Sequence, residues 1–314
     1  MKRKMLNVPK GGYDGMKGFT IVEFLVAGLL SVIVLIAVVS SYFTSRKLND
    51  AANERLAIQQ DLRNAATLIV RDARMAGSFG CFNMSEHIEQ DVVSDVTQKK
   101  PLFPLKRNST RNSTNKLIPI AESPNIGYQG FTQRLNALIF QYGIDDANAS
   151  AETTVVSSCG AISKPSKQIP TLEDAKKELK IQDSDKEQNG NIARQRHVVN
   201  AYAVGKIAGE EGLFRFQLDD KGKWGNPQLL AKKVRRMDVR YIYVSGCFED
   251  EDAGKEEQFK YTDKFDSSVT PAGVEVLLDS GSDAKIAASS DNIIYAYRIN
   301  ATIRGGNVCA NRTL

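Results

Sequence analysis

The stretch Met16-Lys-Gly-Phe-Thr-Ile-Val-Glu-Phe-Leu-Val-Ala-Gly-Leu-Leu30, with the apolar run that continues to Phe43, decides the fold of this chain. The twenty residues from Phe24 to Phe43 carry no charge. A helix of about 20 residues, rising about 1.5 Å per residue, covers the hydrocarbon core of a bilayer, which is about 30 Å thick. The run therefore predicts a membrane-spanning helix, with the acid Glu23 at its cytoplasmic end.

The excess positive charge of the chain lies just before this helix. The formal charge of the whole chain is +5, and residues 1–18, with five basic side chains and one acidic, hold +4 of it. The remaining 37 basic and 36 acidic residues nearly cancel. Because basic residues beside a span stay in the cytoplasm, the pattern places residues 1–18 there and the rest of the chain across the membrane. The net charge is therefore no argument for a nucleic-acid partner.

The order of features at the N-terminus differs from that of a secretory signal peptide. A secretory signal peptide has its small-residue cleavage site after the apolar region. Here the small residue Gly18 precedes that region. A cut after Gly18 would remove residues 1–18 as a leader peptide and leave the apolar helix, residues 19–43, on the mature chain.

The heptapeptide Lys17-Gly-Phe-Thr-Ile-Val-Glu23 resembles the class III signal of type IV pilins and type II secretion pseudopilins. The resemblance implies cleavage between Gly18 and Phe19 by a prepilin peptidase on the cytoplasmic side, and N-methylation of Phe19 by the same enzyme.

Glu23 is the acid that this resemblance makes important. An acid costs roughly 2.5–3.5 kcal/mol near the centre of a membrane helix, and less near an end, so it needs a partner. The new amine on Phe19 of a neighbouring subunit would supply one when helices stack with an axial offset. The alternative is that Glu23 only reaches the membrane interface, which leaves unexplained why an acid stands on the cytoplasmic side.

The helix is expected to continue past the membrane over residues 44–80. No proline occurs from Phe19 to Ala76, and Gly28 is the only glycine there. Apolar residues at three- and four-residue spacing predict an amphipathic helix that lies against a sheet. They are Ile58, Leu62, Ala65, Ala66, Ile69, Ala73 and Ala76. Gly77 provides a stop signal, and two helices with a hinge near Ser40 and Ser41 are the alternative.

Residues 81–314 are expected to form a globular β-rich domain in the periplasm. Alternating or aromatic-rich runs predict strands at 136–142, 153–157, 197–204, 213–218, 234–244, 274–278 and 293–303. Their close spacing and a hairpin turn at 219–222 favour an antiparallel sheet, with Trp224 in a following turn. Residues 160–195 form a charged insertion, in which Thr171 and Asp174 are typical of a helix start. The fold class is therefore α+β.

The end of the long helix gives a closer resemblance. Arg74-Met-Ala-Gly-Ser-Phe-Gly-Cys81 is similar to the junction of PilW-type minor pilins, called PilJ in some species, which are related to the J-type type II secretion pseudopilins. Shorter matches follow in order at 198–204, 212–216, 234–241 and 297–304. The resemblance implies the type IV pilin fold, in which a long N-terminal helix packs on an antiparallel sheet domain with long loops.

Four cysteines follow the span, namely Cys81, Cys159, Cys247 and Cys309. An even number on an exported domain indicates two disulfides, and four cysteines allow three pairings. Order along the chain suggests Cys81 with Cys159 and Cys247 with Cys309.

Metal and nucleic-acid sites are not expected. His87 and His197 lack metal-ligand spacing to any cysteine. The acidic segment 249–254 resembles the start of a calcium loop, but Lys260 stands where such a loop has glutamate. The basic segment 106–116 lacks the aromatic residues of a stacking groove. No nucleophile–base pair or phosphate loop occurs, so neither an enzyme activity nor a cofactor is expected.

The expected function is structural. The family resemblance implies a minor pilin that helps initiate type IV pilus assembly, in a tip complex with other minor pilins and the major pilin. Further expected partners are the prepilin peptidase, the inner-membrane assembly platform and a tip adhesin. The chain would cross the inner membrane once and then move to the pilus tip. Two alternatives stay open: a pilus-tip binding module for DNA, a host surface or an adhesin, and a type II secretion pseudopilin.

Overall fold

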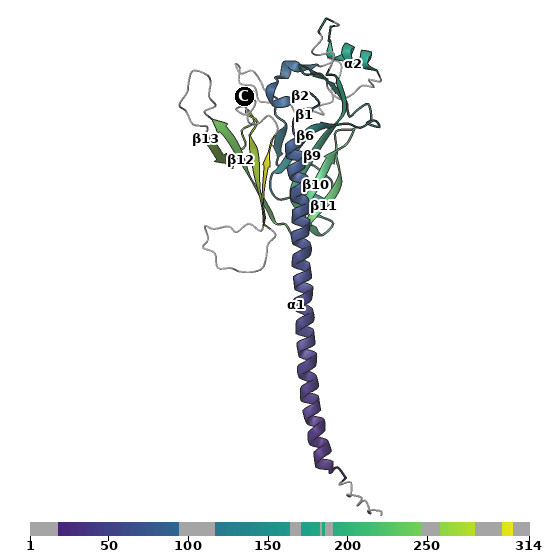
Figure 1. Ribbon diagram of the computed structural model, residues 1–314, viewed down its shortest axis with the longest axis vertical. Coiled ribbons are helices and arrows are strands. Elements are labelled where there is room, and N and C mark those ends of the chain that lie inside the picture. The colour runs from purple at the N-terminus through teal and green to yellow at the C-terminus, as the bar shows by residue number, and fades with distance from the viewer. Residues whose placement is uncertain are drawn as a thin grey trace, which may run out of the picture. The chain divides into compact units, whose positions relative to one another are not determined.

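The structure is a computed structural model that describes residues 18–93, 117–163, 171–182, 184–185, 191–245, 258–279 and 297–303 (Figure 1). The chain forms two compact units, residues 1–56 and residues 57–314. The long helix α1, Ile21–Met75, contributes to both units. The architecture is α+β, as the sequence predicts.

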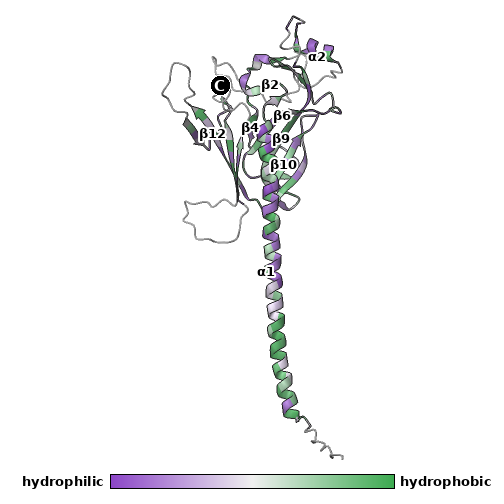
Figure 2. Ribbon diagram, viewed as in Figure 1, coloured by the Kyte–Doolittle hydropathy of each residue, from purple (hydrophilic) through white to green (hydrophobic). Residues whose placement is uncertain are grey.

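Helix α1 is continuous through Ser40 and Ser41, so the alternative with a hinge there is wrong. Its first part, up to Leu56, has no buried residue, and its residues from Phe24 to Phe43 are uncharged and mostly apolar (Figure 2). This part is long and apolar enough to cross a membrane. The second part buries one face, which consists of Leu62, Ala65, Ile69, Asp72 and Ala73.

The chain turns sharply after α1. Gly77 and Gly80 have φ angles of 80° and 67°, a region that glycine adopts without strain. They frame β1, Ser78–Phe79, which pairs with β2, Phe82–Asn83. Two short 3-10 helices follow, η1 at Met84–Glu86 and η2 at Glu89–Asp91.

The larger sheet has nine strands, and its longest strand, β9, lies at its centre. One edge of β9 pairs with β10 and β7, and the other pairs with β6 and β5. Strand β11 extends the sheet beyond β10, β4 pairs with β6, and β8 joins β7 to β3. The bounds are β3 Val92–Val93, β4 Ile120–Ser123, β5 Phe131–Gln133, β6 Ala137–Ile144, β7 Thr154–Ser157, β8 Ile162–Ser163, β9 Ala193–Ile207, β10 Glu210–Leu218 and β11 Trp224–Lys232.

The second sheet has four antiparallel strands in the order β13-β12-β14-β15. They are β12 Arg236–Ser245, β13 Gln258–Thr262, β14 Gly273–Asp279 and β15 Tyr297–Thr302. The short helix α2, Leu172–Leu179, lies in the charged insertion. Thr171 caps α2 by accepting the amide of Asp174 at 3.1 Å, as the sequence predicts.

Two expectations about the strands need correction. The larger sheet is mixed, because β3 and β8 pair in parallel. Trp224 does not lie in a turn but opens β11, opposite Leu218. The Asp219 carboxylate accepts the amides of Lys221 and Lys223 and so closes a tight turn, after which pairing resumes at once. Strand β11 ends the described part of the sheet, an edge position where its Pro227 is tolerated.

The main core lies where the second part of α1 packs against strands of both sheets. Leu62, Ala65 and Ile69 belong to one buried cluster with residues of the nine-stranded sheet, such as Tyr202, and of the four-stranded sheet, such as Tyr241. The apolar spacing in 58–76 thus corresponds to a face buried by two sheets.

Candidate functional site

Gly18 and Phe19 lie at the start of the described chain, immediately before α1. Phe19 is 85 % exposed, and a Cβ atom added at Gly18 would meet no atom within 4 Å. Both residues are therefore exposed at the start of the described chain.

Glu23 lies on the first turn of α1 and makes a capping box with Thr20. The Glu23 Oε2 atom accepts the Thr20 amide and the Thr20 hydroxyl, each at 3.0 Å. The Glu23 amide in turn donates to Thr20 Oγ1 at 3.3 Å. A capping box satisfies two of the amides that a helix start leaves unpaired. The Thr-x-x-Glu spacing that signals it stands in the sequence, but the sequence analysis did not use it.

Asp72 is a functional candidate that the sequence analysis missed. Its side chain is fully buried on α1 and contacts four side chains of the nine-stranded sheet. Tyr142 donates to Oδ1 at 2.8 Å, while Tyr202 and Asn200 donate to Oδ2 at 2.6 and 2.9 Å. We call Asp72 and its partners the Asp72 cluster.

Two arginines complete the Asp72 cluster. Arg71 donates to Oδ1 through Nε at 3.2 Å and Nη2 at 3.0 Å, and Arg215 on β10 donates to Oδ2 at 3.3 Å. The Arg71 side chain is half exposed, but that of Arg215 is only 14 % exposed. The buried carboxylate therefore has both hydrogen-bond donors and positive charges around it, as a buried ion requires.

The tyrosines of the cluster stay protonated at neutral pH. Burial, followed by the Asp72 charge and hydrogen bond, raises the pKa of Tyr142 to about 12. The same causes raise the pKa of Tyr202. Both phenols are therefore donors, and Asp72 is their acceptor.

Cys81 and Cys159 form a disulfide, which confirms that predicted pair. The bond joins the β1–β2 turn to the segment that follows β7. The other predicted pair, Cys247 and Cys309, lies outside the described residues, as does the acidic segment 249–254.

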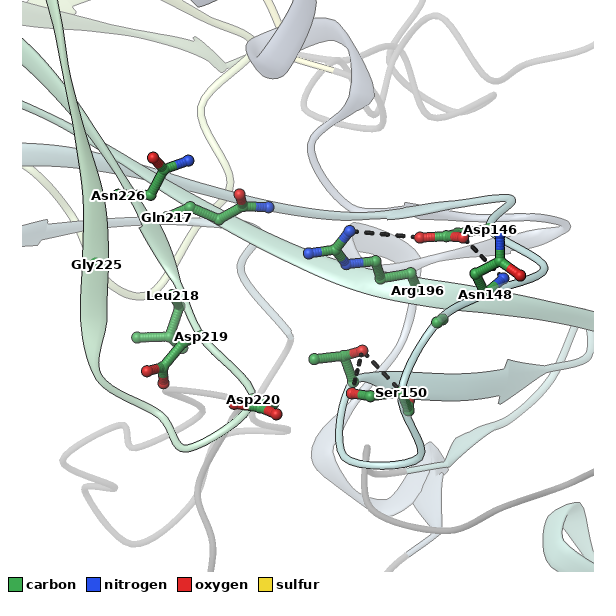
Figure 3. A pocket seen from close by; sticks show the side chains of 12 residues that line it. Asp146, Asn148, Ser150, Arg196, Gln217, Leu218, Asp219, Asp220, Gly225 and Asn226 are labelled. Carbon is green, nitrogen blue, oxygen red and sulfur yellow. Dashed lines mark hydrogen bonds and ion pairs between the residues drawn. The ribbon is translucent and has the colours of Figure 1, made fainter.

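A polar hollow of about 400 Å³ lies between the β6–β7 loop, β9 and the β10–β11 hairpin (Figure 3). Arg196 points toward Asp146 beside it, with Nη1 and Oδ2 separated by 3.4 Å. Other lining groups include Asn148, Ser150 and Gln217. The lining offers donors and acceptors to a polar ligand but no nucleophile with an adjacent base.

No group of three or more histidine, cysteine or acidic residues within the described ranges could hold a metal ion. Comparison with protein-family models and with curated proteins found no match to this chain. The function is therefore inferred from the residues Gly18, Phe19 and Glu23 and from the exposed apolar helix that follows them.

Proposed function

We propose that this chain is a minor pilin that takes part in initiating type IV pilus assembly. The observation that carries the proposal is the class III-type signal around Gly18 and Phe19, placed directly before a helix with no buried residue up to Leu56. A continuous apolar surface of this size requires a bilayer or other helices to cover it. Removal of residues 1–18 would leave this helix with a new amine at Phe19.

Assembly would begin by pairing of apolar helices within the inner membrane. Glu23 of one subunit would meet the Phe19 amine of another, and pairing the acid with a cation offsets the cost of burying it. Ordered, offset stacking would therefore be favoured over random packing. The unit formed by residues 57–314 would select the other minor pilins and the major pilin.

A Glu23→Gln variant tests this role of the acid. Glutamine also serves in a capping box, so the substitution removes the charge but keeps the helix cap. We expect the variant to lose residues 1–18 and gain the methyl group normally, as read by mass spectrometry. Pilus number by electron microscopy should fall severalfold.

Thr20→Ala is the matched control, because it removes the cap and keeps the acid. We expect near-normal piliation in this variant. Normal piliation in Glu23→Gln would contradict the proposal, and normal piliation there with a defect in Thr20→Ala would reduce Glu23 to a capping residue.

The second candidate, a pilus-tip binding module, is favoured by the polar hollow near Arg196. The two functions differ in what deletion of the gene does. Deletion of a priming subunit should abolish pili, and blocking pilus retraction should restore them. Deletion of a binding module should leave pili in normal number but abolish attachment or DNA uptake. A type II secretion pseudopilin, in contrast, would be required for protein secretion and not for pili.

A further inference from the structure

We infer that Asp72 stabilises the observed register of the helix segment 57–75 on the sheet domain. This role concerns how the folded unit 57–314 holds its helix, and it is independent of pilus assembly. A buried, charged residue makes directional contacts, which its apolar neighbours cannot make.

The apolar contacts of this segment are only part of what defines its register. They are non-directional, and their strength follows the apolar area that is buried. A shift of one helical turn would bring Ala66, Ile69 and Ala73 into the places of Leu62, Ala65 and Ile69. Packing therefore favours the observed register, because alanines would replace the large side chains of Leu62 and Ile69.

Asp72 adds a directional preference for the observed register. Its hydrogen bonds are directional, and the sheet holds their donors at fixed positions. Tyr202 and Arg215 are paired across β9 and β10, and Asn200 lies two residues from Tyr202 on the same face. After a one-turn shift, Ala76 would occupy the position of Asp72. The donors would lose their acceptor, and Arg215 would be left largely buried without a carboxylate.

The penalty for such a shift follows from burial. Leaving one member of a buried ion pair without its partner is strongly destabilising, because its desolvation is no longer offset. Single buried polar residues fix register in other helical assemblies for the same reason. The Asp72 cluster therefore adds to packing a preference for the observed register that depends on charge and direction.

The first test replaces the charge with a group of the same size. We expect Asp72→Asn, in the full chain in detergent, to lower the midpoint of thermal unfolding by on the order of 10 °C. Tyr142 should then lose protons about one to two pH units lower, as read from the chemical shift of its Cζ carbon. Asp61→Asn is the control, since Asp61 lies on the same helix and outside the cluster. It should change neither measurement.

The second test reads the register directly. Genetically encoded spin labels at Thr67 on α1 and Lys206 on β9, both exposed, would report one distance in the parent protein. We expect Asp72→Asn to broaden the distribution of this distance, because the remaining apolar contacts are non-directional. The Asp61→Asn control should keep the single distance.

A third variant keeps the inference falsifiable if Asp72→Asn does not fold. Tyr142→Phe removes one donor and leaves the charge pair with Arg215. It should broaden the distance distribution relative to the parent protein. A single, unchanged distance in every folded cluster variant would show that packing alone sets the register and would overturn the inference.

Discussion

Asp72 and His197 are both buried in the sheet-containing unit, but their surroundings stabilise the charged form of Asp72 and disfavour the charged form of His197. Arginines and hydroxyl donors compensate the Asp72 carboxylate. His197 instead lies beside the Phe79 ring, and its Nε2 is 3.2 Å from Gln141 Oε1. Burial lowers the pKa of His197 to about 3, because the charged ring would lose its hydration. His197 is therefore neutral in the folded protein.

This histidine should make the domain sensitive to acid. Below about pH 6.5 the unfolded chain binds a proton at this histidine, whose pKa is then near 6.5, whereas in the folded chain His197 stays neutral until much lower pH. Stability is therefore fully present above about pH 6.5 and is lost as pH falls toward 3. Between pH 6.5 and 4.5 this one group should remove about 2 kcal/mol from the free energy of unfolding.

A His197→Gln variant, followed by urea unfolding at pH 6.5 and 4.5, checks the effect. The variant should be less stable than the parent at pH 6.5, because it loses ring packing. It should lose clearly less stability than the parent over the same acid step. Equal losses in the two proteins would mean that other groups cause the acid sensitivity.

At the scale of the element, α1 is one continuous helix whose two parts have different surroundings: the first is exposed, and the second packs in the core. Ile69 is fully buried between the sheets, whereas Leu56 is 63 % exposed. We expect Ile69→Ala to lower the free energy of unfolding of the domain by roughly 2–5 kcal/mol, through lost transfer energy and a residual cavity. Leu56→Ala should change it by less than about 0.5 kcal/mol. Similar effects of the two substitutions in chemical denaturation would contradict this division of α1.

The Cys81–Cys159 disulfide supports the chain where α1 ends. It closes a loop of 78 residues in sequence. Loop-closure entropy in the unfolded chain predicts a stabilisation of about 4 kcal/mol. Replacing both cysteines with serine should reduce the free energy of unfolding by up to this amount, measured in urea. A change below about 1 kcal/mol would show that the native contacts already restrict this loop.

At the scale of the molecule, the two units should differ in their dependence on a membrane. A fragment of residues 57–314 keeps Leu62, Ile69 and Asp72 and loses the exposed apolar helix. We expect it to be soluble without detergent and to unfold cooperatively in circular dichroism. A fragment that begins at Gly77 lacks the core helix segment and should aggregate. Aggregation of both fragments would indicate that residues 21–56 also contribute to the fold.

Much of the architecture could be read from local patterns. The continuous helix follows from the absence of proline and from apolar spacing, and β6, β9, β10 and β14 follow from alternation. Strands β4 and β5 and the edge strand β13 were not predicted, because their few residues carry no clear period. Strand β11 was not predicted either, because Trp224 and Pro227 suggest a turn in isolation. Its pairing with β10 overrides that local preference.

By itself, the sequence determined the apolar helix and the two-part character of α1, because these depend on neighbours within a few residues. It also predicts a processing junction at Gly18 and Phe19. Only the tertiary structure decided the role of Asp72. Its contacts with Tyr142, Tyr202 and Arg215 join residues 70, 130 and 143 positions apart. In the sequence, an acid among polar helix residues cannot be distinguished from a solvated one. Folding surrounds Asp72 with donors from three strands, and its burial makes these contacts necessary to stabilise the charge.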